Sequence, residues 1–273
     1  MNLINELPLV LVSGQARSGT TILTKAIAAH PQVLSNGKEN NWLRDLAGFA
    51  QETFGNESRV KQLAVSQSQF LDNFRGAAYQ SLFPELAEYS AENTNPLENI
   101  KALSTFSSLR EDTFDMVPQL LPNVFLVNIV RNGIEVVSSR MSHQHIGKGR
   151  DFRTHCIAWA HGLHVVKWAE SNDAIADRFF LVRHHDLLVA ETCRDVFGKL
   201  QQRLGLDDSD ACHDFVQQNF VSRNKGSASP QSAEGNRERQ LAWQQWDQQQ
   251  RDQFEEVCGA AMEHLGYPIP WGD

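Results

Sequence analysis

The chain has 273 residues, of which 41% are hydrophobic and 21% are charged, a composition typical of a folded domain and not of a disordered chain. Its formal net charge of −8 excludes a general nucleic-acid binder, because such proteins carry a basic surface field. There is no apolar run of about 18 residues and no basic N-terminal segment, so neither a membrane span nor a signal peptide is predicted. We therefore expect one cytoplasmic domain over residues 1–273.

The four cysteines stand far apart in the sequence, at positions 156, 193, 212 and 258. None of them forms the C-x-x-C spacing typical of metal sites, and their separation does not indicate a disulfide framework. We predict buried, reduced thiols, as is usual in a cytosolic protein.

The first predicted elements are a buried strand over residues 9–12 and a helix over 20–30, joined by the glycine-containing segment 14–21. A glycine turn between a strand and a helix N-terminus can hold a phosphate group, because backbone N–H groups and the helix dipole converge there. Thr20 stands where the loop G-x-x-x-x-G-K-(S/T) has its lysine, and Arg17 lies inside the loop instead. The alternative is a plain strand-to-helix turn.

A short second strand is predicted at 33–35. Residues 43–89 follow with a polar-rich helical pattern that breaks near Gly55 and Pro84. Residues 97–106 are then predicted to form a helix.

The clearest strand covers 124–130, and it ends at Arg131. A strand of a nucleotide hydrolase would end there in an aspartate that holds Mg²⁺. An arginine instead favours direct binding of an anion, and Ser139, eight residues later on a predicted helix over 133–141, can add a hydroxyl. The alternative is a surface arginine paired with Glu135.

The C-terminal half continues the alternation of strands and helices. The predicted elements are a long helix over 152–170, a strand over 179–182, a helix over 191–204, a mobile loop over 222–240 and a last helix over 246–265.

This alternation predicts an α/β fold of three layers, with a mostly parallel, P-loop-like central sheet flanked by helices. Ligands in such sheets bind at the carboxyl ends of the strands. Arg17, Glu39, Arg131 and Arg183 all follow predicted strands, so we expect them at one edge.

Two of these motifs resemble the sulfotransferases that use 3′-phosphoadenosine 5′-phosphosulfate (PAPS). Residues 17–21 match the family's loop R-S-G-T-T, which holds the 5′-phosphosulfate. Arg131 and Ser139 match its 3′-phosphate motif, with Gly133 in place of a proline. Weaker matches follow at residues 183–187 and 265–267.

The pattern is similar to tyrosylprotein and bacterial small-molecule sulfotransferases, which also have an A-H-P element, as at residues 29–31, and a glutamate after it. The resemblance implies that Glu39 is the catalytic base. It also implies a lysine in a K-(T/D)-P element, but the matching place here is Asn93-Thr94-Asn95-Pro96. Lys38 or Arg17 would then supply the missing charge. Three histidines in or near a glycine-rich segment are rival bases, interpreted as surface or substrate-loop residues: His143, His145 and His155.

The resemblance further implies PAPS as co-substrate, adenosine 3′,5′-bisphosphate as product, and no metal. His184 stands where the family has a tyrosine near the adenine. Arg223 and Lys225 lie in a segment that resembles the family's loop over the nucleotide. The residues expected at the donor are Arg17, Ser18, Gly19, Thr20, Thr21, Arg131, Ser139, His184, Arg223 and Lys225.

The function expected from the sequence is transfer of a sulfuryl group to an acceptor hydroxyl or amine. Two alternatives stay open: a P-loop kinase or ATPase, and a non-catalytic nucleotide-binding protein on the same fold. Residues 43–90 and 143–156 are predicted to line the acceptor pocket. The acceptor can be a peptidyl tyrosine, a sugar, a lipid head group or a small metabolite.

Overall fold

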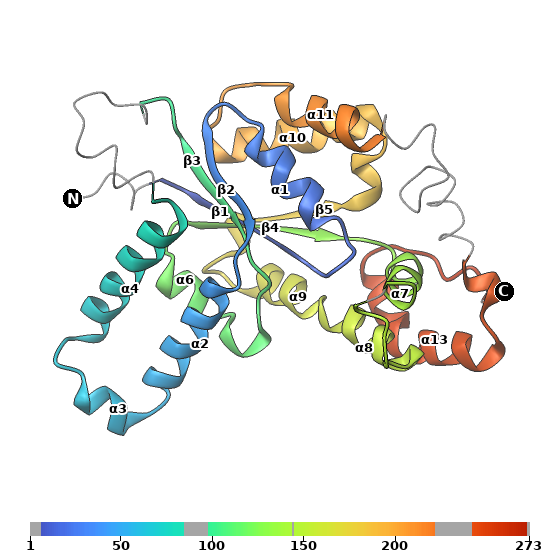
Figure 1. The fold of residues 1–273 in the computed structure, drawn as a ribbon, viewed down its shortest axis with the longest axis horizontal. Helices are drawn as coiled ribbons and strands as arrows, with labels where there is room; N and C mark the ends of the chain where they lie inside the picture. Colours follow the sequence, from blue (N-terminus) through green and yellow to red (C-terminus); the bar gives the residue numbers. More distant parts are fainter. Residues whose placement is uncertain (1–6, 85–97, 144, 222–241, 272–273) are drawn as a thin grey trace.

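The structure is a computed structural model, and it describes residues 7–84, 98–143, 145–221 and 242–271. Within these residues, one parallel sheet has the strand order β2-β3-β1-β4-β5 (Figure 1). Its strands are β1 (Leu9–Gly14), β2 (Val33–Glu39), β3 (Ala102–Phe106), β4 (Val124–Val130) and β5 (Phe179–Arg183). Helices cover both faces, which confirms the predicted three-layer α/β fold.

The strands of the sheet centre are buried on both faces. Leu9 and Leu11 of β1 pack into one hydrophobic core, whereas Val10 and Val12 pack into a second core on the opposite face. Successive side chains of a strand point to opposite faces, so a doubly covered strand must be apolar at every position. All seven residues of β4 are buried in the same way. Their sequences are apolar almost throughout, which explains why β1 and β4 were predicted correctly.

The helices divide between the two cores. One face packs against α1 (Thr20–Ala28), α10 (Ala190–Leu204) and α11 (Ala211–Val216). The other packs against α2 (Trp42–Phe54), α4 (Gln67–Leu82), α6 (Met116–Leu120), α7 (Gly133–Met141), α8 (Phe152–His161), α9 (His164–Ser171) and α13 (Gln248–His264). Between α2 and α4 lies α3 (Glu57–Gln62), which buries none of its residues. Figure 1 shows these three helices extending from one end of the sheet.

The predicted helix over 97–106 is wrong, because residues 102–106 form β3. This strand lies between β2 and β1, and all five of its residues are buried. A short apolar run fits a buried strand and a helix equally well by periodicity, so pairing with neighbouring strands decides its structure.

The predicted helix over 152–170 is interrupted, and Gly162 and Leu163 separate α8 from α9. Gly162 caps the C-terminus of α8, and the side chain of Gln15 occupies the space that a Cβ at Gly162 would take. The break therefore accommodates a residue that lies far away in the sequence.

The cysteines are buried and free, as predicted. Cys156 and Cys258 lie in one core, and Cys193 and Cys212 in the other. Within the described residues, no helix is both long enough and apolar enough to cross a membrane. The predicted loop over 222–240 lies outside these residues.

The interior position of β3 leads to a stability prediction. Leu103 has an exposed fraction of 0%, so Leu103→Ala should lower the free energy of unfolding by about 2–5 kcal/mol, measured by urea denaturation. Val60→Ala on α3, where the side chain is exposed, is the control and should cost less than about 0.5 kcal/mol. A loss below about 1 kcal/mol at Leu103 would contradict the buried strand.

Candidate active site

The segment 14–21 forms a tight loop between β1 and α1. Gly14 and Gly19 have φ angles of 152° and 104°, and Arg17, with φ of 81°, is the one non-glycine residue of the described chain with positive φ. A Cβ at Gly14 would lie 2.7 Å from the carbonyl oxygen of Ile129 on β4. Glycine is therefore required at 14, and the unusual backbone at Arg17 is of the kind that concentrates at functional sites.

The N-terminus of α1 faces this loop without a side-chain cap. Gly19 is the N-cap residue, it makes no side-chain cap hydrogen bond, and the first turn holds no acidic residue. Unpaired N–H groups and the helix dipole at such an end attract an anion. Ser18 is buried and its Oγ donates to the carbonyl of Gln15 at 2.6 Å, so this hydroxyl closes the loop.

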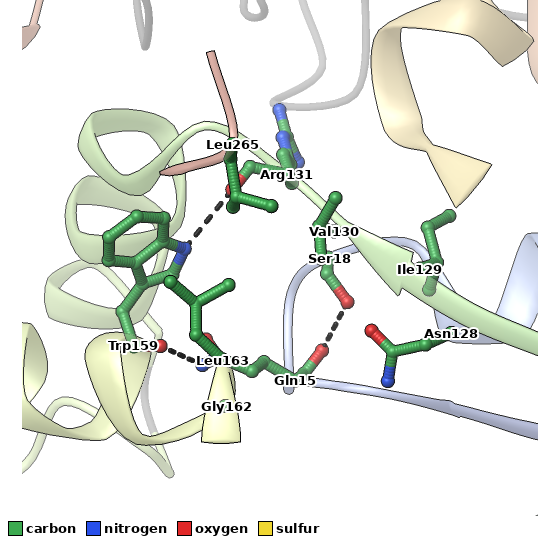
Figure 2. A pocket seen from close by; sticks show the side chains of 10 residues that line it. All are labelled: Gln15, Ser18, Asn128, Ile129, Val130, Arg131, Trp159, Gly162, Leu163 and Leu265. Atoms are coloured by element: carbon green, nitrogen blue, oxygen red, sulfur yellow. Dashed lines mark hydrogen bonds between the residues drawn. The ribbon is translucent and has the colours of Figure 1, made fainter. Parts of the chain in front are cut away.

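Arg131, at the end of β4, is buried and holds three parts of the structure together. Its Nε and Nη2 lie 2.7 and 2.6 Å from Oε2 of Glu135, and its Nη1 donates to the carbonyl of Arg17 at 3.3 Å. Its own carbonyl accepts a hydrogen bond of 3.1 Å from the indole of Trp159 (Figure 2). The ion pair with Glu135, left open by the sequence, is present, but it lies in the interior and not at the surface.

The two phosphate motifs meet in space. Nε of Arg17 donates to Oγ of Ser139 at 3.0 Å, although the two residues are 122 positions apart. His184, on the 3₁₀ turn η4 (His184–Leu187) after β5, packs against the same loop. A Cβ at Gly19 would lie 2.8 Å from its Cδ2 atom. The loop, the end of β4 and the end of β5 therefore converge at one edge of the sheet.

Two residues of this region, Gln15 and Trp159, were not assigned a role from the sequence. The amide of Gln15 donates to the carbonyl of Trp159, which ties the loop to α8. Together with Leu265 they help to line a closed cavity of about 10 Å³ beneath the loop (Figure 2). That volume suits about one water molecule. Glutamine and tryptophan have many structural uses, so no local pattern identifies such a role.

Glu39 and Lys38 lie at the same edge but on an outer strand. The pairing of β2 with β3 shifts between Ser35 and Glu39, where Gly37 has φ of 63°, and both charged side chains are exposed. Because β3 separates β2 from β1, Glu39 is two strands away from the loop. Its role as base stays a prediction.

A cleft of about 770 Å³ opens beside the loop. Its walls come from the start of the loop, from the segment after β3, from the end of α7 and from α8. Thr154 is the lining residue that belongs to the predicted acceptor segment 143–156. The residues that line it are Ser13, Gly14, Gln15, Ala16, Ser108, Leu109, Arg110, Glu111, Asp112, Phe114, Arg140, Thr154, Ile157, Ala158, His161, Gly162 and Val165.

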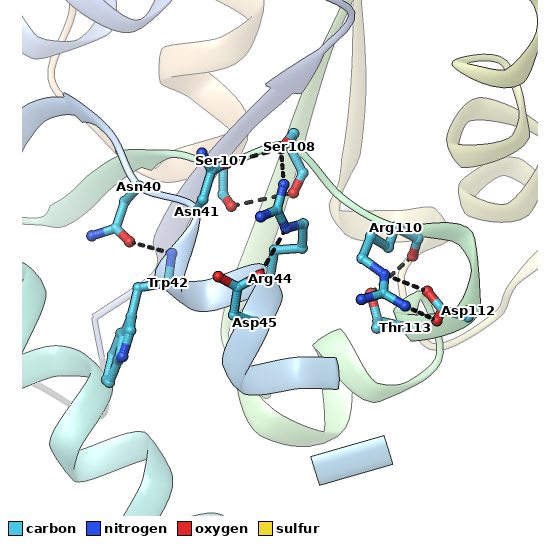
Figure 3. Close-up of polar contacts among 10 residues, drawn as sticks. All are labelled: Asn40, Asn41, Trp42, Arg44, Asp45, Ser107, Ser108, Arg110, Asp112 and Thr113. Atoms are coloured by element: carbon cyan, nitrogen blue, oxygen red, sulfur yellow. Dashed lines mark hydrogen bonds and ion pairs between the residues drawn. The ribbon is translucent and has the colours of Figure 1, made fainter. Parts of the chain in front are cut away.

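Polar contacts hold the wall formed after β3. Oγ of Ser108 donates to Oδ1 of Asn41 at 3.0 Å, and Nη1 of Arg44 donates to the same Oγ at 3.4 Å (Figure 3). Arg110 forms an ion pair with Asp112. The start of α2 therefore supports this side of the cleft.

Histidines also lie near the cleft. His155 was predicted to be a surface or substrate-loop residue, but it is buried in α8, and neither ring nitrogen has a hydrogen-bond partner. Burial lowers the pKa of His155, and the charges of Arg140 and Arg150 lower it further. At the cleft wall, Glu111, His161 and His164 each place a ligand atom within 4.8 Å of the others, an arrangement that can coordinate a metal ion.

The comparison with known families decides the identity of the fold. A family model described as "Sulfotransferase family" matches residues 8–210, which is most of the chain. The protein belongs to the sulfotransferase family. No curated protein matches it.

Solved structures agree with this assignment. The sulfotransferase is similar to the sulfotransferase domain from the curacin biosynthetic pathway, with a TM-score of 0.57, 16% identity and coverage of 97% of this chain and 99% of that one. It is also similar to the sulfotransferase domain of the olefin synthase from Synechococcus PCC 7002, with a TM-score of 0.55, 15% identity and 96% coverage of both chains. At these identities the likeness shows the fold alone.

Some predicted site residues lie outside the described residues. These are Arg223 and Lys225, and the segment 93–96 that was matched to the family's lysine element. The described residues that the sequence predicted for the donor lie at one edge of the sheet; they are residues 17–21, Arg131, Ser139 and His184.

The buried ion pair of this sulfotransferase leads to a second stability prediction. Glu135→Gln should lower the free energy of unfolding by about 3–5 kcal/mol, because it removes the carboxylate that balances the buried charge of Arg131. Urea denaturation measures the change. Glu256→Gln is the matched control, since it breaks an exposed pair with Arg153 and should have little effect. Equal losses in both variants would contradict this role of the pair.

Proposed function

We propose that the protein transfers a sulfuryl group from PAPS to a hydroxyl or amine of an acceptor, without a metal. The observation that carries the proposal is the contact between Arg17 and Ser139, which joins the loop to the helix after Arg131. One motif alone would suit many phosphate ligands. Two anion-binding motifs in contact suit a donor with a 5′-phosphosulfate and a 3′-phosphate.

The donor would be held at both ends. The N–H groups of Gly19, Thr20 and Thr21 and the side chain of Arg17 would hold the 5′-phosphosulfate, and the uncapped N-terminus of α1 supports this role. Ser139 and Arg131 would hold the 3′-phosphate, with Glu135 fixing the orientation of the guanidinium group. His184, packed against Gly19, would lie near the adenine.

The transfer is an in-line displacement at sulfur. An oxygen or nitrogen of the acceptor forms a bond to sulfur while the bond from sulfur to the bridging phosphate oxygen breaks. Glu39 takes the acceptor proton, and adenosine 3′,5′-bisphosphate leaves with the bridging electrons. Arg17 or Lys38 offsets the charge on the leaving phosphate. Positioning and electrostatic stabilisation supply the rate, as in phosphoryl transfer.

Nucleotide binding tests the donor. Adenosine 3′,5′-bisphosphate at 100 times its Kd should stabilise the protein by about 2.7 kcal/mol and raise its Tm, since it binds only the native state. Arg17→Ala should abolish the shift. Arg194→Ala should keep it, because Arg194 is an exposed residue paired with Asp210 on another helix. Stabilisation by ATP–Mg²⁺ and not by the bisphosphate would favour a P-loop kinase or ATPase and overturn the proposal.

Turnover tests the base. With labelled PAPS and a panel of hydroxyl and amine acceptors, Glu39→Ala should lower kcat by about 10²–10⁴-fold, the usual contribution of a general base. The control Glu57→Ala, an exposed glutamate of α3, should leave kcat unchanged. Unchanged kcat in Glu39→Ala would remove the base assignment. Bisphosphate binding without transfer to any acceptor would favour a non-catalytic nucleotide-binding protein.

A further inference from the structure

The charged residues around the cleft are nearly all paired with one another. Arg110 forms an ion pair with Asp112, and Oε2 of Glu111 lies 2.7 Å from Nδ1 of His164. Arg140 is different, because its Nε makes no hydrogen bond and no carboxylate pairs with it in the described part of the chain. Among the described charged residues that line the cleft, Arg140 is the one without a counter-ion.

The absence of a counter-ion among the described residues is unusual because Arg140 is buried. The exposed fraction of the residue is 7%, and its Nε atom is buried without a hydrogen-bond partner among those residues. Burial lowers the pKa of Arg140, and the neighbouring charge of Arg150 lowers it further. The C-terminal dipole of α7 attracts the charge, but only as a partial negative charge. A buried cation without an anion is costly, and it is retained where a ligand supplies the anion.

His155 adds to the same environment. It is 1% exposed, and neither its Nδ1 nor its Nε2 has a partner. Burial lowers the pKa of His155, the positive charges of Arg140 and Arg150 lower it further, and the carboxylate of Asp151 opposes them with a smaller effect. This corner of the site therefore combines positive charge with unused hydrogen-bonding groups, which is the chemistry that recognises an anion.

The anion bound here would be distinct from the donor's phosphates. Ser139 and Arg140 are consecutive on α7, so their side chains project about 100° apart around the helix axis. Ser139 contacts Arg17, and neither of these residues lines the cleft. Arg140 lines the cleft together with Ala16 and Thr154. One helix thus presents consecutive residues to two different regions.

We propose that Arg140 binds an anionic group of the acceptor, a carboxylate, phosphate or sulfate that the acceptor carries in addition to its reacting hydroxyl or amine. This inference rests on the proposed sulfuryl transfer. The rest of the wall includes Leu109, Phe114 and Ile157, so the body of the acceptor next to the anionic group is apolar. The substrate class is therefore an apolar hydroxy or amino compound with an acidic group.

The experiment compares matched acids and esters. The probes are 3-(4-hydroxyphenyl)propanoate and 12-hydroxydodecanoate, each with its methyl ester, assayed with labelled PAPS and by thermal shift in the presence of adenosine 3′,5′-bisphosphate. At least one acid should exceed its ester by about tenfold or more in kcat/KM, as expected for a hydrogen-bonded charge pair. That acid should also raise the Tm more than its ester.

Variants assign the preference to Arg140. Arg140→Gln should bring the acid-to-ester ratio towards one through a higher KM for the acid, with the KM for PAPS unchanged. Arg140→Lys should keep part of the preference. The control is Arg153→Gln on α8, where the arginine is exposed, paired with Glu256 and absent from the cleft lining.

The outcomes separate this inference from the proposed function. If no acid is preferred over its ester in turnover or in thermal shift, the anion site is wrong. It is also wrong if Arg140→Gln weakens PAPS binding and leaves the acid preference intact. If an acid binds in a manner that depends on Arg140 while no transfer occurs, the anion site stands and the sulfuryl transfer fails. The comparison of acids and esters uses only the natural protein. It can therefore overturn the anion site even if an Arg140 variant does not fold.

Discussion

The geometry of the site depends on the buried ion pair between Arg131 and Glu135. The guanidinium group of Arg131, at 8% exposure, is stabilised by the close carboxylate of Glu135, and this pair holds the first turn of α7 against the end of β4. The same arginine binds the carbonyl of Arg17, and its own carbonyl binds Trp159. Loop, strand and α8 therefore keep a common geometry, and the side chain of Arg17 can reach Ser139. Loss of this pair would affect every other contact at the edge.

The helix α7 contributes consecutive residues to two regions of the site. Ser139 belongs to the region of the loop, where N–H groups and arginines favour phosphate. Arg140 belongs to the cleft, where the other charged side chains have partners and the walls are partly apolar. Ser139 and Arg140 are consecutive residues, so one helix contributes both to the loop region and to the cleft.

Prediction from sequence succeeded where a local pattern is unambiguous. β1 and β4 are buried on both faces and are apolar almost throughout, and the loop between Gly14 and Thr21 carries its turn glycines in the sequence itself. Prediction failed where the structure of a segment depends on its contacts with distant segments. β3 is a strand because β1 and β2 pair with it, and the break at Gly162 exists because Gln15 lies there. The surface or substrate-loop position expected for His155 failed for the same reason, since its burial comes from packing.

The sequence by itself determined the types of chemical group at the site. A glycine loop with Arg17, and a strand that ends in Arg131, indicate direct binding of phosphate, and their order along the chain indicates one α/β sheet. Only the tertiary structure decided which of these groups have partners. It brought Glu135 to Arg131 in the interior, Arg17 to Ser139, and no carboxylate to Arg140 in the described residues. The reason is that chemistry is a property of each residue, whereas burial and pairing depend on segments that only folding brings together.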